Sequence, residues 1–324
     1  MLATPSPRAP RFMVVDMLRG LAIIGVVFYH FCWDLSYFRF IGVDVSYEWG
    51  WVAFARALLA VFVFLVGVSL VLAHGQGVRW RPFLKRLAIL VGAAGLITIG
   101  TLVAFPELFV FFGILHAIAL FSVLCLPFLR APPLLTGALG LVIVIAAFAI
   151  SLPEFSAKPL AWIGFWDIAP PTNDLVPVFP WFGVALLGVA TAKLVLNSPL
   201  GPRLAAFAPQ ARPWRWLAVL GRWTLVIYLV HQPIFLAVLF PLANQMQTQQ
   251  LARGNEFLLT CERSCYESSG NAGYCTAYCA CSLDAIEVGN LWDAIQTPTP
   301  TPQQSQAVAE VTNQCAIPPN GLPQ

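Results

Sequence analysis

Long apolar runs, separated by short polar or proline-rich loops, dominate the first 245 residues of the chain. An apolar helix needs about 20 residues to cross the ~30 Å hydrocarbon core of a bilayer. The runs predict seven membrane helices, at residues 12–38, 51–73, 83–105, 107–129, 132–152, 178–196 and 216–242. The predicted fold class is therefore an all-α polytopic membrane helix bundle.

The first predicted helix carries a polar edge. Its apolar sequence is interrupted by Asp16, Arg19, His30 and Asp34, which at about 100° per residue fall within roughly 60° of one helix face. An ionisable side chain facing lipid costs about 2.5 kcal/mol or more, so this edge is expected to face other helices or a water-filled cleft. Either the edge serves a function, or it forms a buried ion pair and a hydrogen-bonded histidine that only fix the packing.

The composition agrees with a membrane protein. The 324 residues are 59% hydrophobic and 10% charged, whereas soluble domains have about 25% charged residues. Residues 1–245 hold 16 basic and 8 acidic side chains, and residues 246–324 hold 2 basic and 7 acidic ones. The acidic tail should repel nucleic acid, and we expect no nucleic-acid partner. The sequence leaves oligomer formation open.

The basic residues predict how the chain is oriented in the bilayer. Thirteen lysines and arginines fall in the N-terminal segment, in alternate loops or at adjoining helix ends, and three fall on the other side. By the positive-inside rule, the N-terminal segment 1–11 is cytoplasmic and the C-terminal tail is not. In a bacterial inner membrane the tail would be periplasmic. No small-residue cleavage site follows the first apolar run, so we expect a retained helix rather than a removed signal peptide.

The cysteines support the same orientation. Cys32 and Cys125 lie in predicted membrane helices, where cysteine behaves as a small hydrophobe. Six more cysteines lie in the tail: Cys261, Cys265, Cys275, Cys279, Cys281 and Cys315. Six cysteines in a short extracytoplasmic segment predict up to three disulfides, with 15 possible connectivities. A metal site is the weaker alternative, because the tail lacks histidine and structural zinc prefers other spacings, so no metal is expected.

The tail is expected to have two parts. Residues 246–295 are predicted to form a Cys-rich helical hairpin, because two cysteine pairs have the i and i+4 spacing of one helix face. Residues 296–324 form a Pro/Gln-rich C-terminal segment, in which 296–306 predict a disordered linker.

Three histidines are predicted at similar depth in the outer half of the membrane, so His30, His116 and His231 could share one cavity. His30 and Asp34 are at i and i+4 and can touch. A carboxylate that orients an imidazole makes its other nitrogen a competent base or nucleophile. The catalytic candidates are therefore His30, Asp34 and His116, although Arg56 could pair with Asp34 instead.

Other residues are candidates for binding. Arg19, Arg86 and Arg222 give the cytoplasmic end enough positive charge for a phosphorylated cofactor. Asp16 either pairs with Arg19 at i and i+3 or contacts an anionic ligand. In the last predicted helix, Tyr228, His231 and Gln232 follow helical spacing. The binding candidates are Asp16, Arg19, Arg56, Arg86, Arg222, His231 and Gln232. The sequence contains no P-loop, Rossmann glycine signature, HExxH or GxSxG motif.

Five segments of the chain form an ordered set: VVDMLRGLAIIGVVFYHFCWDLSYF, VFVFLVGVSL, GILHAIAL, FPWFGVALLGV and GRWTLVIYLVHQPIF. In this set the chain resembles the bacterial branch of the heparan-alpha-glucosaminide N-acetyltransferase catalytic-domain family. The resemblance covers residues 11–243 and leaves the Cys-rich tail outside. It identifies residues 12–245 as a transmembrane acyltransferase-like domain.

The resemblance implies transfer of acetyl from cytoplasmic acetyl-CoA to an amine or hydroxyl of an extracytoplasmic sugar or glycan. It also implies an essential histidine, which in the lysosomal members follows the first helix in a lumenal loop. The loop 36–50 has no histidine here, so the role falls to His30 or His116. Whether acetyl is carried covalently stays open. The alternatives are a transporter or flippase that uses the same polar cleft without chemistry, and a haem protein with two axial histidines.

Overall fold

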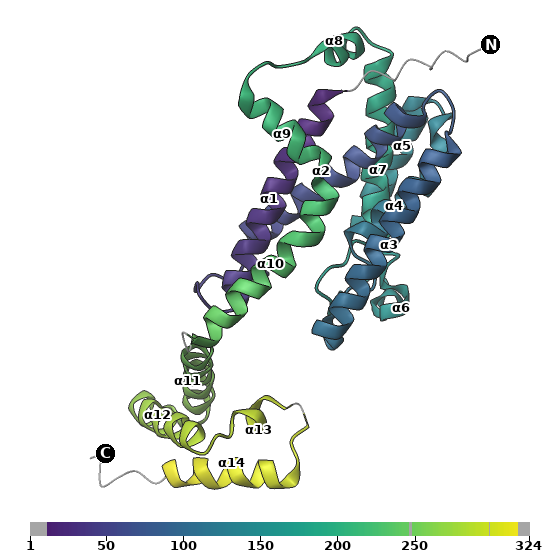
Figure 1. Cartoon of the computed structure of the whole chain (residues 1–324). Helices are drawn as coiled ribbons and strands as arrows, with labels where there is room; N and C mark the ends of the chain where they lie inside the picture. The colour runs from purple at the N-terminus through teal and green to yellow at the C-terminus, as the bar shows by residue number, and fades with distance from the viewer. Residues whose placement is uncertain (1–11, 246–247, 298, 317–324) are drawn as a thin grey trace, which may run out of the picture. The chain divides into compact units, whose positions relative to one another are not determined.

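The computed structural model describes residues 12–245, 248–297 and 299–316 (Figure 1). The chain forms two compact units. The first comprises Met1–Asp34 and Val43–Leu236, and the second comprises Leu35–Gly42 and Ala237–Gln324. Helices make up nearly all regular structure in the described residues, where the one β-type contact is an isolated bridge between Phe112 and Leu175. The predicted all-α class is confirmed.

Five helices in the described residues are long and apolar enough to cross a membrane. They are α1 (Met13–Tyr37), α2 (Trp49–His74), α3 (Trp80–Ala104), α7 (Val178–Leu196) and α10 (Thr224–Gln245). Two shorter apolar helices, α4 (Ile114–Leu124) and α5 (Pro133–Ala149), occupy the places of the fourth and fifth predicted spans. The total of seven spans and the domain limits near residues 11, 245 and 295 stay predictions.

The remaining helices are short or lie in the second unit. The first unit also contains α6 (Lys158–Ala161), α8 (Leu200–Ala206), α9 (Arg212–Arg222) and three 3-10 turns at Pro106–Leu108, Pro127–Leu129 and Pro153–Ser156. The second unit contains α11 (Thr248–Ser269), α12 (Ala272–Val288), α13 (Trp292–Gln296) and α14 (Pro302–Cys315).

Two predicted helices are interrupted. The span predicted at 107–129 contains only α4 as α-helix, because residues 109–113 are not helical and the chain turns again at Pro127. A proline lacks the backbone N–H that would continue the helical ladder. The span predicted at 216–242 is divided at Trp223 into α9 and α10. Both predictions of continuous helices were therefore wrong.

Glycines bring the helices of the first unit into backbone contact. At the crossing of α2 and α7, a Cβ on Gly67 would lie 2.1 Å from the Ala185 carbonyl oxygen, and one on Gly188 would lie 2.1 Å from that of Phe64. At the crossing of α1 and α9, a Cβ on Gly221 would lie 1.7 Å from the Asp16 carbonyl oxygen. Small residues permit this close approach in membranes, where packing rather than water exclusion drives association. The polar edge of α1 is thus fixed against its neighbours.

The second unit is stapled as predicted. Disulfides Cys261–Cys279 and Cys265–Cys275 join α11 to α12, and Cys281–Cys315 joins α12 to α14. All six tail cysteines are therefore paired, which confirms the predicted disulfides.

The predicted linker 296–306 was wrong from Pro302 onward, where α14 begins. The Thr301 hydroxyl accepts from the Gln304 backbone N–H at 3.3 Å, and the Gln304 side chain accepts from the Thr301 N–H at 2.8 Å. This reciprocal capping box marks the start of a helix. The repeated Thr-Pro pattern had instead indicated a disordered linker.

We expect Gly188→Ala to destabilise the protein by about 1–3 kcal/mol, because the new methyl group overpacks the α2–α7 crossing. Gly92→Ala is the matched control, since a Cβ there meets no atom within 4 Å and alanine favours the helix by about 0.5–1 kcal/mol. Thermal unfolding of the detergent-solubilised protein measures both. Equal stability of the two variants would contradict the close crossing.

Candidate functional site

A cavity of about 260 Å³ lies among α1, α2, α3, α4, α9 and α10. Three arginines from three different helices line it: Arg19 on α1, Arg86 on α3 and Arg222 on α9. Val26 and Tyr228 line it as well, and most of the other lining side chains are apolar. The structure therefore brings together the three arginines that the sequence marked as candidates, around a space that an anionic group can enter.

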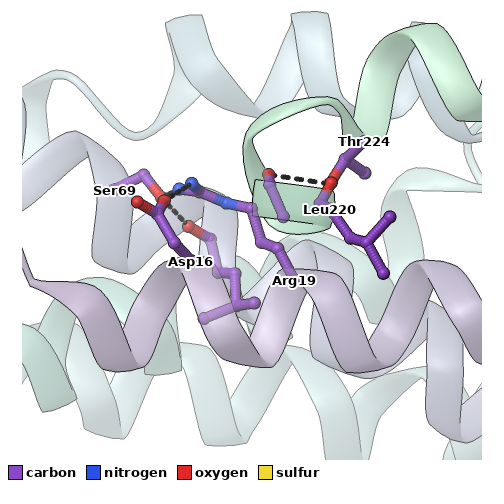
Figure 2. A network of polar contacts seen from close by, with 7 residues as sticks. Asp16, Arg19, Ser69, Leu220 and Thr224 are labelled. Atoms are coloured by element: carbon purple, nitrogen blue, oxygen red, sulfur yellow. Dashed lines mark hydrogen bonds and ion pairs between the residues drawn. The ribbon is translucent and has the colours of Figure 1, made fainter. Parts of the chain in front are cut away.

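Arg19 is held by a network at the edge of this cavity (Figure 2). Its Nη1 lies 3.1 Å from Oδ1 of Asp16, so the predicted i, i+3 ion pair is formed. Its Nη2 donates to the hydroxyl of Ser69 on α2, which in turn donates to the Leu65 carbonyl oxygen. The guanidinium of Arg19 is thus oriented by both α1 and α2 before any ligand binds.

Two imidazoles face each other across α1 and α10. The rings of His30 and His231 have centroids 5.0 Å apart and meet at 68°. Nδ1 of His231 lies 3.1 Å from the Ile227 carbonyl oxygen. A carbonyl can only accept, so Nδ1 carries a proton and Nε2 of the neutral ring is left with its lone pair. Direct ring contact leaves no space for a porphyrin between these two histidines.

The next polar contact joins Asp34, one turn after His30 on α1, to Gln232, the residue after His231 on α10. Nε2 of Gln232 donates to Oδ1 of Asp34 at 2.6 Å, and Asp34 is fully buried. Asp34 therefore pairs across to α10. The described residues show no hydrogen bond from Asp34 to His30 and no ion pair from it to Arg56, which is exposed. Both contacts predicted for Asp34 were wrong, because the amide on the facing helix is its partner.

Three buried atoms of this cluster have no hydrogen-bond partner among the described residues. They are Oδ2 of Asp34, Oε1 of Gln232 and Nε2 of His231. Each is an acceptor, given the bonds that its other polar atom makes. A buried unpaired polar atom costs about 1–3 kcal/mol, so the cluster suits a ligand that brings N–H or O–H donors.

His116 lies in another environment, in a second cavity lined by residues of α3 and α4 such as Ala94. The Thr98 hydroxyl donates to the Val110 carbonyl oxygen at 2.8 Å, so it accepts from Nε2 of His116, 3.2 Å away. Nδ1 of His116 accepts from the Gly113 N–H at 3.3 Å. Both ring nitrogens are therefore used in holding the start of α4 against α3. Of the three histidines predicted at one depth, the structure joins two.

Tyr228 belongs to the cavity lining and also lies near His231. Its ring lines the arginine cavity, and its centroid lies 5.7 Å from that of His231. The helical spacing of Tyr228 and His231 was visible in the sequence, but it did not show that Tyr228 lines the same cavity as the three arginines.

Asp174 is a polar residue that sequence reasoning gave no role. Its Oδ2 accepts from the backbone N–H of Ile114 at 2.8 Å, at the N-terminus of α4. Burial raises the pKa of Asp174 to about 6, and the hydrogen bond from Ile114 opposes that rise. A Cβ on Gly113 would lie 2.3 Å from Oδ2 of Asp174, so this approach needs glycine. No sequence signal distinguishes Asp174 from the other acidic residues of its loop.

Comparison with protein families identifies the chain. The family model described as heparan-alpha-glucosaminide N-acetyltransferase, catalytic, matches residues 11–233. The chain belongs to this family. The match begins just before α1 and ends directly after Gln232, so it contains the arginine cavity and the polar residues shared by α1 and α10. It stops before α11–α14, which contain the six paired cysteines.

No curated protein and no solved structure matches the chain. Membership of the heparan-alpha-glucosaminide N-acetyltransferase catalytic-domain family implies membrane acetyltransferase activity in general terms. The description of individual side chains therefore depends on this chain's own geometry.

We expect His116→Ala to destabilise the fold by about 1–3 kcal/mol, because it leaves polar groups of Thr98 and Gly113 without their partner. Acetyltransferase activity per folded molecule should stay near the wild-type value. Thermal unfolding and a thiol-release assay on the same preparation measure the two effects. Loss of activity at unchanged stability would instead assign His116 to the chemistry.

Proposed function

We propose that this protein moves an acetyl group from cytoplasmic acetyl-CoA to an amine or hydroxyl of an extracytoplasmic sugar or glycan. The observation that carries the proposal is the place of Tyr228, which lines the arginine cavity and has its ring centroid 5.7 Å from that of His231. An anionic, cytoplasmic donor suits one end of this arrangement. An acetyl acceptor that carries N–H or O–H groups suits the unpaired hydrogen-bond acceptor atoms at the other end.

Arg19, Arg86 and Arg222 are proposed to bind the phosphate groups of acetyl-CoA through charge-assisted hydrogen bonds. Arg86 and Arg222 are exposed, whereas Arg19 is partly buried and held by Asp16 and Ser69. The cavity of about 260 Å³ is smaller than the roughly 300–1,000 Å³ that encloses a drug-sized ligand. The nucleotide end of the donor would therefore remain outside while the thioester end lies inward.

His30 is the proposed catalytic base, with His231 as its partner. The imidazole of His30 takes the proton from the N–H or O–H group of the acetyl acceptor. The nitrogen or oxygen of that group then attacks the thioester carbonyl carbon. The carbon–sulfur bond breaks, and the thiolate leaves with the proton that the imidazole had taken. Asp34 and Gln232 orient the acceptor through their unpaired oxygens.

The proposed location is a bacterial inner membrane, with the lipid bilayer and an extracytoplasmic glycan as partners. The basic residues support a cytoplasmic N-terminus. The three disulfides of the second unit support a periplasmic tail, because such bonds persist in oxidising compartments.

We expect His30→Ala to lower kcat for acetyl transfer by about 10²–10⁴-fold, the usual contribution of a general base. Thiol release from acetyl-CoA, measured with purified protein and glucosamine as acceptor, gives the rate. His116→Ala is the matched control and should keep its activity. Wild-type activity in each of the two single variants, His30→Ala and His231→Ala, would refute the proposed base. Transport of a labelled glycan without acetyl-CoA consumption would favour the flippase.

We expect Arg86→Gln to raise KM for acetyl-CoA by about 10-fold or more, because a charge-assisted hydrogen bond contributes about 1.5–3 kcal/mol. The value of kcat should change little, since Arg86 is proposed to bind the donor and takes no part in the proton transfer. Arg81→Gln is the control, because Arg81 is an exposed residue of the same helix that does not line the cavity. An equal change of KM in both variants would show a general charge effect instead of a site.

A further inference from the structure

We propose that the phenol hydroxyl of Tyr228 donates the hydrogen bond that stabilises the oxyanion formed when the thioester is attacked. The inference rests on the proposed acetyl transfer and assigns it a further catalytic residue. The structural basis is that Tyr228 lines the arginine cavity while its ring centroid lies 5.7 Å from that of His231.

The ring of Tyr228 is fixed by apolar packing on two sides. It packs against the buried cluster of Leu90, Ala94 and Leu115 from α3 and α4, and against the cluster of Ile23 and Phe62 from α1 and α2. A side chain held between two clusters keeps one direction for its hydroxyl. A donor that is oriented before the reaction needs no reorganisation when charge develops.

The hydroxyl of Tyr228 makes no hydrogen bond to any of the residues that the structure describes. The other hydroxyls near the cavity are used within the protein: Ser69 donates to the Leu65 carbonyl oxygen, and Thr224 donates to that of Gly221 at 2.8 Å. A tyrosine hydroxyl in an apolar setting usually has a hydrogen-bond partner. The free donor of Tyr228 therefore fits a partner that the ligand supplies.

Acetyl transfer requires a hydrogen-bond donor close to the carbonyl oxygen of the thioester. Attack on the carbonyl carbon forms the new bond and moves an electron pair onto the carbonyl oxygen, which becomes an oxyanion. The oxyanion then collapses, the carbon–sulfur bond breaks, and the thiolate accepts the proton held by the imidazole. Tyr228 transfers no proton in this sequence, since its O–H only donates a hydrogen bond to the oxyanion. The same role applies whether the acetyl group passes directly or through an acyl-histidine.

The location of the other polar groups leaves this task to Tyr228. Near the proposed place of the acetyl acceptor, the unpaired atoms of Asp34 and Gln232 are hydrogen-bond acceptors, so they cannot stabilise an oxyanion. Arg19 is the partly buried arginine, and it is engaged by Asp16 and Ser69. Tyr228 combines a place in the cavity lining, a ring near that of His231 and a neutral hydroxyl that makes no hydrogen bond within the described residues.

The test is Tyr228→Phe, which removes one oxygen atom and keeps the ring. We expect kcat to fall by about 10²-fold, in the range known for removal of one oxyanion donor, while KM for acetyl-CoA stays within about twofold. Tyr47→Phe is the matched control, because Tyr47 is 85% exposed and lies outside the site. The pH profile of kcat should keep its shape, since the imidazole base is intact.

Binding of coenzyme A, measured by calorimetry on the same variant, separates catalysis from structure. An unchanged Kd with the lowered kcat supports the oxyanion role. A weakened Kd, or wild-type kcat in Tyr228→Phe when the wild-type enzyme turns over acetyl-CoA, overturns this role and leaves the proposed function standing. A wild-type protein that does not consume acetyl-CoA with glucosamine or another glycan amine overturns both.

Discussion

The arrangement of the first unit depends on one constraint: the polar groups on α1 must find partners inside the protein, because lipid offers none. At one end, Asp16 and Ser69 hold Arg19. At the other end, Gln232 donates to the fully buried Asp34. Because these partners lie on α2 and α10, satisfying the edge of α1 fixes two neighbouring helices. The same requirement produces a polar interior in an otherwise apolar bundle.

Close backbone contact makes these partners reachable. A Cβ on Gly20 would lie 2.0 Å from the Leu217 carbonyl oxygen, and Gly221 approaches the Asp16 carbonyl in the same way. α9 therefore lies directly against the charged start of α1, which brings Arg222 to the cavity that Arg19 lines. The break at Trp223 then lets α10 follow a separate course past His30. The interruption of the helix at Trp223 thus determines where the side chains of α9 and α10 lie.

The sequence predicted what depends on local periodicity, and it did not predict what depends on helix neighbours. The polar edge of α1, the Asp16–Arg19 pair and the convergence of three arginines follow from spacing and from charge at one end of the bundle. The partner of Asp34 did not: the sequence offered His30 or Arg56, and Gln232 becomes the evident partner only when the packing of α1 on α10 is known. His116 resembles His231 in the sequence, yet Thr98 and Gly113 occupy its nitrogens. The hydrogen bonds of each ring, which the sequence pattern does not show, decide which histidine keeps an unpaired nitrogen.

Hydrogen-bond donors and hydrogen-bond acceptors lie at opposite ends of the polar interior. The end that holds the arginines presents donors, which suit an anion. The end that holds Asp34, Gln232 and Nε2 of His231 presents acceptors, which suit an amine or hydroxyl. A structural ion-pair network would neutralise such groups within the protein, whereas here the unpaired atoms at one end are all of one kind. Two substrates of opposite hydrogen-bonding character, as proposed for the acetyl donor and the acetyl acceptor, would satisfy both ends at once. The family match covers all of these groups and ends before α11.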